Sequence, residues 1–115
     1  MEIKVLKNNQ NLKLKPAKLA VIDIGSNSIR MLIYEDFNSS RVPFFNEKAV
    51  CELGKNLDKS RKLHKSGVDY AQKVLKRFSE ILHVSKIDNL KIIATAVLRE
   101  ATDAKPFVEY VENLF

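Results

Sequence analysis

The pattern of apolar and polar positions in the first half of the chain predicts three strands. Residues 18–24 form a short apolar run with a polar residue near its end, KLAVIDI, which is typical of a buried strand. Residues 25–28, GSNS, have the composition of a turn, and residues 29–35, IRMLIYE, resume as a strand. A second turn over 36–40 leads to a third strand over 41–51. Three strands in this order predict an antiparallel meander.

A polar loop and an amphipathic helix follow the meander. Residues 53–64 are mostly polar and are interrupted by Gly54, so we expect a loop there. Over 67–83 the apolar residues recur at helical spacing, and Ser66 is suited to cap the helix N-terminus. The apolar stripe of this helix consists of Val68, Ala71, Val74, Leu75, Phe78, Ile81 and Leu82.

The last part of the chain predicts a strand and a second helix. Residues 90–95, LKIIAT, form another short apolar run, and a loop carrying Arg99 follows it. Asp103 is placed to cap a final helix. The order β-β-β-α-β-α predicts an α/β fold. The strand at 90–95 should run parallel to a sheet neighbour, because a helical crossover connects it to the meander.

The composition of the chain excludes several classes of protein. With 115 residues, 45% hydrophobic and 30% charged, the chain has room for one small domain and resembles an ordinary globular protein. No apolar run approaches the roughly 20 residues needed to span a bilayer, and no secretory apolar region follows the N-terminal lysines. Cys51 is the only cysteine, so no internal disulfide can form. We therefore expect a cytoplasmic protein with no membrane partner.

Most of the positive charge lies near the N-terminus. The formal net charge is +6, and residues 1–18 contribute +4 of it, since they hold five lysines and one glutamate. We expect residues 1–16 to form a loosely ordered basic leader and residues 17–115 to form the folded domain. A polyanionic partner suits this charge, and so does a plain solubilising tail. Nucleic acid is a weaker candidate, because the sequence lacks basic motifs interleaved with aromatic residues.

The candidate chemistry lies in the segment DIGSNSIR, residues 23–30. Gly25 lacks a Cβ, so the backbone N–H groups of a tight turn here can approach an anion. Asp23 is costly to bury unless it is paired, and beside a phosphate its usual partner is Mg²⁺. The other donors of the turn are Ser26, Asn27 and Ser28. The segment is neither a Walker P-loop nor a dinucleotide fingerprint, and a plain hairpin turn is the alternative interpretation.

Two motifs together resemble one protein family. An Asp-x-Gly-Ser hairpin that opens a three-stranded meander is similar to the first phosphate loop of the actin-like ATPase superfamily. Within it, IDIGSNSIR at 22–30 followed by ATAVLREA at 94–101 resembles the exopolyphosphatase/guanosine pentaphosphate phosphatase (Ppx/GppA) family. Glu47-Lys48 and Leu53-Gly54 also fall where that family tends to have them. The resemblance runs over about residues 20–111 and implies part of an actin-like, ribonuclease H-like ATPase domain.

The resemblance also implies roles for individual residues. In this family the loop that matches residues 23–28 binds the phosphates of polyphosphate or guanosine pentaphosphate together with a divalent ion. Asp23 would be the acid on the metal side, with Mg²⁺ or another divalent cation as cofactor. The phosphate donors would be Gly25, Ser26, Asn27, Ser28, Arg30 and Arg99. A guanidinium matches phosphate oxygens bidentately, although a surface ion pair is the alternative role for each arginine.

Part of the family's catalytic apparatus has no counterpart in this sequence. Family members continue into a stretch with a glutamate general base and then a second, glycine-rich phosphate loop, whereas glycine occurs here only at 25, 54 and 67. We therefore expect no catalytic residue in this chain and no turnover by the chain alone. A fragment, a split-gene product and a remnant all fit this pattern.

The expected partners follow from the missing general base and second phosphate loop. A separately encoded remainder of the enzyme would complete the site, and a second copy of the chain would cover exposed sheet edges. The alternative function is a non-catalytic module that binds polyphosphate or nucleotides through the same loop.

Overall fold

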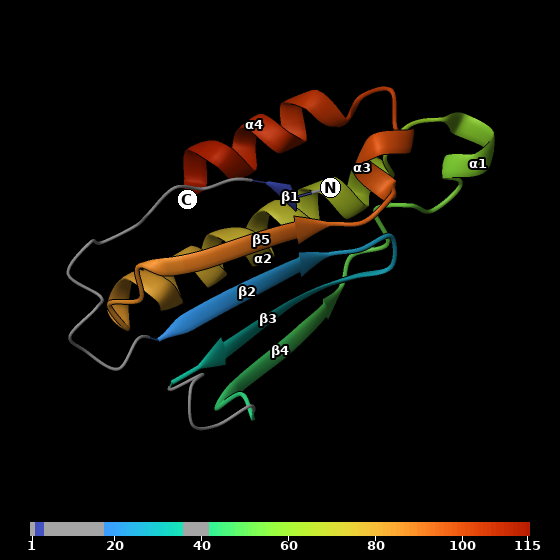
Figure 1. Cartoon of the computed structure of the whole chain (residues 1–115). Coiled ribbons are helices and arrows are strands. Elements are labelled where there is room, and N and C mark those ends of the chain that lie inside the picture. Colours follow the sequence, from blue (N-terminus) through green and yellow to red (C-terminus); the bar gives the residue numbers. More distant parts are fainter. Residues whose placement is uncertain (1, 4–17, 36–41) are drawn as a thin grey trace.

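One mixed β-sheet organises the part of the chain that the computed structural model describes, which is residues 2–3, 18–35 and 42–115. The sheet has five strands in the order β1-β5-β2-β3-β4. The strands are β1 (Glu2–Ile3), β2 (Leu19–Ile24), β3 (Ser28–Tyr34), β4 (Phe45–Val50) and β5 (Asn89–Ala94). The helices are α1 (Leu57–Ser60), α2 (Lys65–Val84), α3 (Val97–Glu100) and α4 (Ala104–Leu114). Figure 1 shows their arrangement.

The strand pairing confirms the predicted α/β topology. β2, β3 and β4 form an antiparallel meander, in which Ile24 pairs with Ile29 and Ile29 pairs with Ala49. After α1 and α2, the chain returns as β5, which lies parallel to β2 with Ile22 opposite Ile92. Because β2 and β5 run in the same direction, their carboxyl ends meet at one edge of the sheet. The turn at residues 25–28 leaves the sheet at that edge.

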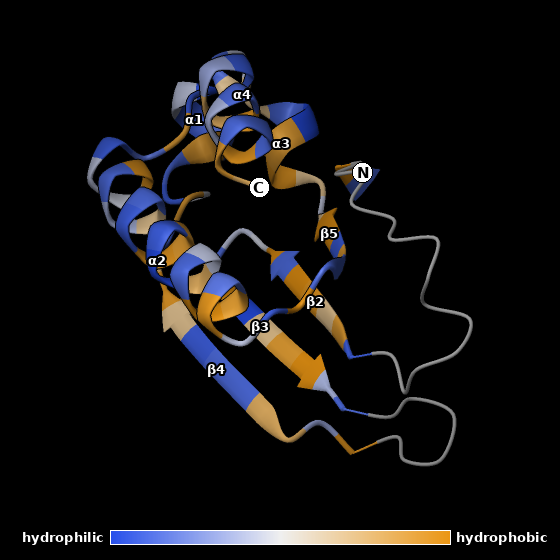
Figure 2. Cartoon of the chain, turned by 90° about the vertical axis from the view of Figure 1, so that its left-hand side faces the viewer, coloured by the Kyte–Doolittle hydropathy of each residue, from blue (hydrophilic) through white to orange (hydrophobic). Residues whose placement is uncertain are grey.

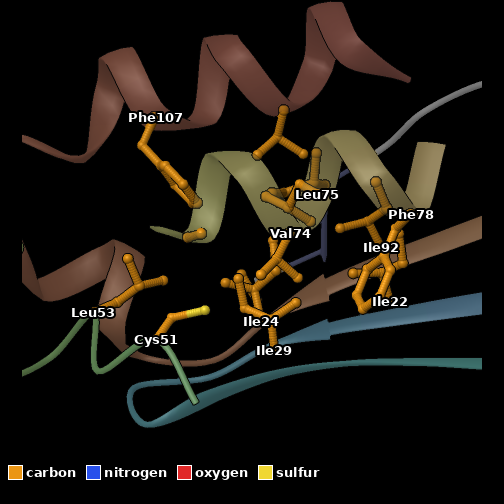
Figure 3. Close-up of a cluster of buried hydrophobic side chains, with 14 of the residues drawn as sticks. Ile22, Ile24, Ile29, Cys51, Leu53, Val74, Leu75, Phe78, Ile92 and Phe107 are labelled. Carbon is orange, nitrogen blue, oxygen red and sulfur yellow. The ribbon is translucent and has the colours of Figure 1, made fainter. Parts of the chain in front are cut away.

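The two faces of the sheet differ in their cover. α2 and α4 lie on the same side of the sheet, and the outer surface of α2 is largely hydrophilic (Figure 2). The strand residues on the covered face are almost fully buried, and Figure 3 shows several of them packed beneath α2. They are Ala20, Ile22, Ile24, Ile29, Met31, Ile33, Ile92 and Ala94. We call the opposite face, which carries Asp23, Arg30 and Lys48, the open face.

The predicted stripe on α2 is confirmed, but the predicted cap is wrong. Ala71, Val74, Leu75, Phe78 and Leu82 are all buried. The helix begins earlier than the pattern predicted. His64 occupies the N-cap position without a side-chain capping bond, and the Ser66 hydroxyl lies 2.8 Å from Nε2 of His64 instead.

Two segments predicted as loops contain short helices. α1 interrupts the loop predicted over 53–64, and α3 carries Arg99 where a loop was expected. Each has four residues, which is too short for a helical period to be visible in the sequence. The turn expected over 36–40 and residues 1 and 4–16 of the basic leader lie outside the described residues. Glu2 and Ile3 of that leader form β1, which pairs antiparallel with β5.

Candidate functional site

The turn between β2 and β3 is closed by its own backbone. The N–H of Gly25 donates to the carbonyl oxygen of Ser28 over 2.9 Å, and Ser26 and Asn27 lie exposed at the tip. A Cβ built on Gly25 would lie 3.2 Å from that same oxygen, so glycine lets the two strands approach closely here. The amide of Gly25 is therefore occupied within the turn, and the donors that face a ligand come from the residues after it.

The carbonyl groups of the turn are held by the segment that follows β4. The N–H groups of Cys51 and Glu52 both donate to the carbonyl oxygen of Asn27, over 3.0 and 2.9 Å. The N–H of Gly54 donates to the carbonyl oxygen of Ser26 over 2.9 Å. Within the described part of the chain, the backbone N–H groups of Ser26 and Asn27 meet no acceptor. The tip of the turn thus has satisfied acceptors and free donors, which is the pattern of an anion site.

Asp23 lies on the open face, one residue before the end of β2. It is directly opposite Arg30 on β3, and Arg30 is in turn opposite Lys48 on β4. The sequence pattern suggested a buried acid that needed a partner, but the Asp23 side chain is exposed and keeps its hydration. The described residues contain no group of three or more His, Cys, Asp or Glu side chains placed to hold a metal ion together.

The two predicted arginines differ in their relation to the turn. Nη1 of Arg30 donates to Oδ1 of Asn46 over 2.6 Å. Asn46 is opposite Leu32, which is farther from the turn than Arg30, so the Arg30 side chain is directed away from the tip. Arg99 is exposed on α3, and α3 lies at the same end of the sheet as the turn (Figure 1).

A direct hydrogen bond ties the segment before α3 to the base of the turn. The N–H of Thr95 donates to the carbonyl oxygen of Ile24 over 3.0 Å. Ile24 immediately precedes Gly25, so the start of the Arg99 segment is fixed against the end of β2. The structure therefore brings Arg99 to the same edge as residues 25–28, whereas Arg30 is held by Asn46 on the open face.

Sequence reasoning missed the contribution of residues 51–54, which we call the clamp segment. Leu53 is fully buried, and Figure 3 shows it with Cys51 on the side of the sheet that carries Ile24, Ile29 and α2. A Cβ built on Gly54 would lie only 2.0 Å from Oγ of Ser26. The Leu53-Gly54 pair was the available signal, but a polar loop broken by glycine gives no indication of where that loop packs.

Cys51 is a buried structural residue of this segment. Its side chain is 5% exposed, and its thiol lies 3.7 Å from the carbonyl oxygen of Ala49. Burial raises the pKa of the Cys51 thiol, because the thiolate would lose its hydration. The residue therefore acts as a small apolar side chain.

Known proteins match most of this chain. A sequence model described as the Ppx/GppA phosphatase family matches residues 32–115. That match begins within β3, after the turn. The "Guanosine-5'-triphosphate,3'-diphosphate pyrophosphatase" of Aeromonas hydrophila subsp. hydrophila is 30% identical over 95 residues, which is 83% of this chain. The same identity and coverage hold for the protein of that name from Aeromonas salmonicida.

Solved structures match the fold. The crystal structure of the Aquifex aeolicus member of the Ppx/GppA family gives a TM-score of 0.78 at 26% identity, covering 84% of this chain and 32% of that chain. An exopolyphosphatase from Cytophaga hutchinsonii gives a TM-score of 0.75 at 24% identity, with 84% and 31% covered. The fold is thus part of an actin-like ATPase domain, as the resemblance of the two sequence motifs implied.

The chain is much shorter than these relatives. It spans 19% of the length of the Aeromonas proteins and about a third of the solved structures. Among the described residues, no helix has the length and apolar character needed to cross a membrane. The family match nevertheless covers well over half of the chain, from β3 to the final residue. On these grounds, the chain belongs to the Ppx/GppA phosphatase family.

Proposed function

We propose that the turn at residues 25–28 binds a terminal phosphate of inorganic polyphosphate or guanosine pentaphosphate, as the N-terminal phosphate-binding segment of a Ppx/GppA-type phosphatase. One observation carries this proposal. The carbonyl oxygens of Ser26 and Asn27 are occupied by the clamp segment, while the N–H groups of the same two residues meet no acceptor among the described residues. The backbone of Ser26 and Asn27 thus presents two N–H donors to a phosphate oxygen, with both of its carbonyl oxygens already bonded.

Side chains around the turn suit the same ligand. The hydroxyl of Ser26, the amide of Asn27 and the hydroxyl of Ser28 supply further donors at the tip. Arg99 lies at the same edge of the sheet and would contact a phosphate bidentately. Arg30 would join the site only after leaving Asn46, so we expect it to contribute less than Arg99 to binding.

A divalent cation such as Mg²⁺ fits beside Asp23. Proteins commonly hold this ion through one or two carboxylates, with phosphate oxygens and water completing the shell. Asp23 offers an exposed carboxylate one residue before the end of β2, at the edge from which the turn projects. When bound, the ion would neutralise charge on the phosphate chain. Asp23 would hold the ion on the open face of the sheet.

We propose further that the chain needs more of the family domain in order to hydrolyse its ligand. The resemblance assigns the general base and the second phosphate loop to segments without a counterpart in these 115 residues. Among the residues that the structure describes, β4 is an outer strand, and β1 pairs with Ile92 and Ile93 of β5 alone. A separately encoded remainder or a second copy would meet the sheet at these two outer strands. The lone buried cysteine fits a reducing cytoplasm.

Calorimetric titration with inorganic tripolyphosphate at low and physiological ionic strength tests the binding site. Arg99→Ala should weaken the binding that survives at physiological salt by about three- to tenfold, since the guanidinium is exposed and screened. Lys73→Ala is the matched control, because it removes an exposed cation from the outer face of α2. Replacing Lys4, Lys7, Lys13 and Lys15 by glutamine removes the charge of the leader while β1 and the buried Ile3 stay in place. This variant should mainly lose the binding that is lost at the higher salt concentration.

A variant without a charge change distinguishes binding at the turn from non-specific electrostatic attraction. Asn27→Ala should weaken binding at both salt concentrations without changing the net charge. Equal affinities for the parent, Asn27→Ala and Arg99→Ala at both salt concentrations would show that residues 25–28 are only a hairpin turn.

A further inference from the structure

The clamp segment and the turn approach each other as backbone against backbone. Three N–H groups of the segment reach two carbonyl oxygens of the turn, with N–O distances of 2.9–3.0 Å. Glu52 adopts a left-handed conformation, with φ of 57°, and this bend brings its own N–H and that of Cys51 onto the same oxygen. No side chain of residues 51–54 contributes to these bonds.

Gly54 is the closest point of this approach. A Cβ at this position would lie 2.0 Å from Oγ of Ser26, 3.0 Å from its Cβ and 3.4 Å from its Cα. The first distance is a clash, the second is a tight contact, and the third is an ordinary one. An alanine at position 54 would therefore require the Ser26 side chain to rotate and the two segments to move slightly apart, which would lengthen the bond from the N–H of residue 54 to the carbonyl oxygen of Ser26.

The bond from Gly54 fixes the orientation of one donor in the site. The carbonyl of Ser26 and the N–H of Asn27 belong to the same peptide group, and in a planar trans peptide they point in opposite directions. When Gly54 holds the oxygen of Ser26, the N–H of Asn27 must point away from the clamp segment. That N–H meets no acceptor in the described part of the chain.

We infer that Gly54 is a positioning residue for the phosphate site, which it serves by setting the peptide plane between Ser26 and Asn27. This role rests on the proposed function, because it specifies how one donor of the turn is presented to phosphate. Gly54 touches no ligand itself. Its contribution is the space that lets two backbone segments meet and the hydrogen bond that then holds the donor in place.

The first experiment follows the backbone amide signals of the 115-residue chain by NMR during titration with inorganic tripolyphosphate. In the parent, the Asn27 signal should shift on binding. In Gly54→Ala, that shift should be reduced and the dissociation constant should rise about tenfold, which corresponds to the loss of one charge-assisted hydrogen bond. Leu82→Ala is the control for stability, since it removes a buried side chain near the C-terminal end of α2, and no hydrogen bond joins Leu82 to the turn or to the clamp segment.

A second variant tests whether contact with the Ser26 side chain causes the loss of affinity in Gly54→Ala. Ser26→Gly removes both atoms that a Cβ at Gly54 would strike, leaving only the Cα at an ordinary distance. Ser26→Gly alone should weaken binding through the lost hydroxyl. Adding Gly54→Ala to Ser26→Gly should then change the dissociation constant by less than about twofold. An equal loss of affinity from Gly54→Ala in both backgrounds would show that contact with the Ser26 side chain is not its cause, and that result would overturn the positioning role.

Amide hydrogen exchange tests the geometry without any ligand. The Gly54 amide should be protected and the Asn27 amide should exchange freely, and the reverse pattern would contradict the inference even if Gly54→Ala fails to fold. If the Asn27 amide signal of the parent does not shift when tripolyphosphate is added, both the phosphate proposal and the positioning role of Gly54 are refuted. A parent that binds while Gly54→Ala binds equally tightly would refute the role of Gly54 alone.

Discussion

Replacing Gly67 by alanine sets two effects of opposite sign against each other. Gly67 is the third residue of α2, and in a helix alanine is favoured over glycine by about 0.5–1 kcal/mol. A Cβ at this position, however, would lie 2.5 Å from the carbonyl oxygen of Cys51 and 3.0 Å from that of Glu52. These are backbone atoms, so they cannot rotate out of the way as the end of a side chain would.

The steric effect should dominate. Forcing one extra carbon into a well-packed site typically costs about 1–3 kcal/mol, which exceeds the gain in helix propensity. We therefore expect Gly67→Ala to lower the free energy of unfolding by about 1–2 kcal/mol. For a domain near 100 residues, each kcal/mol lowers Tm by about 4–8 °C. The α2 backbone and the clamp segment must separate to relieve the contact, so phosphate binding at the turn should weaken as well.

Thermal and urea unfolding, followed by far-UV circular dichroism, measure this balance. Lys73 lies exposed in the same helix, so the difference between Lys73→Gly and Lys73→Ala gives the helix-propensity effect without the steric one. Subtracting it from the result for Gly67→Ala isolates the clash with the clamp segment. A Gly67→Ala chain that is as stable as the parent, or more stable, would show that α2 does not press on residues 51 and 52.

Two further predictions concern the chain alone. It should release no phosphate from polyphosphate or guanosine pentaphosphate above background, and steady Mg²⁺-dependent release that is lost in Asp23→Ala would place a general base within these 115 residues. Cys51 should react slowly with a thiol-specific disulfide reagent in the folded chain and rapidly in urea, because the thiol is buried and burial raises its pKa. The same raised pKa means that stability should fall as the pH rises through the ordinary thiol range, since only the unfolded chain then ionises readily, and unfolding measured against pH checks this direction. Equal thiol reactivity in the folded and unfolded chains would contradict the buried position of Cys51.

The regular elements were predictable because each has a local cause. In β2, the alternate residues Ala20, Ile22 and Ile24 are fully buried while Asp23 between them is exposed, which is the period of a strand with one covered face. The long stripe of α2 fixed its inner face in the same way. The parallel partner of β2 followed from the crossover rule rather than from any single residue.

Elements that depend on distant contacts were not predictable. Asp103 has a residue type suited to capping α4, yet its Oδ1 accepts the N–H of Leu63 over 2.9 Å, 40 positions away in the sequence. The helix α1 lies between Asn56 and Arg61, which both adopt left-handed conformations. Asn56 is a residue type that tolerates this conformation, but Arg61 is not, so the sequence gives no turn signal where the helix ends.

The roles of the glycines in the candidate site were not predictable either, because they depend on contacts between distant segments. From the sequence, Gly25 predicts a turn and Gly54 a break in a loop, since glycine usually marks a positive φ or a chain reversal. None of the three glycines has a positive φ, and each instead lies where a Cβ would meet another backbone segment or its side chain.

The close contacts at the three glycines form a chain from the turn between β2 and β3 to the helix α2. Gly25 lets β2 approach β3 within the turn, Gly54 lets the clamp segment approach the turn, and Gly67 lets α2 approach the clamp segment. A substitution at Gly67 should therefore reach the phosphate donors through backbone contacts alone, although α2 carries no residue of the proposed site. Phosphate affinity should therefore fall as the side chain at position 67 becomes larger, even where the net charge and all the proposed ligand residues are unchanged.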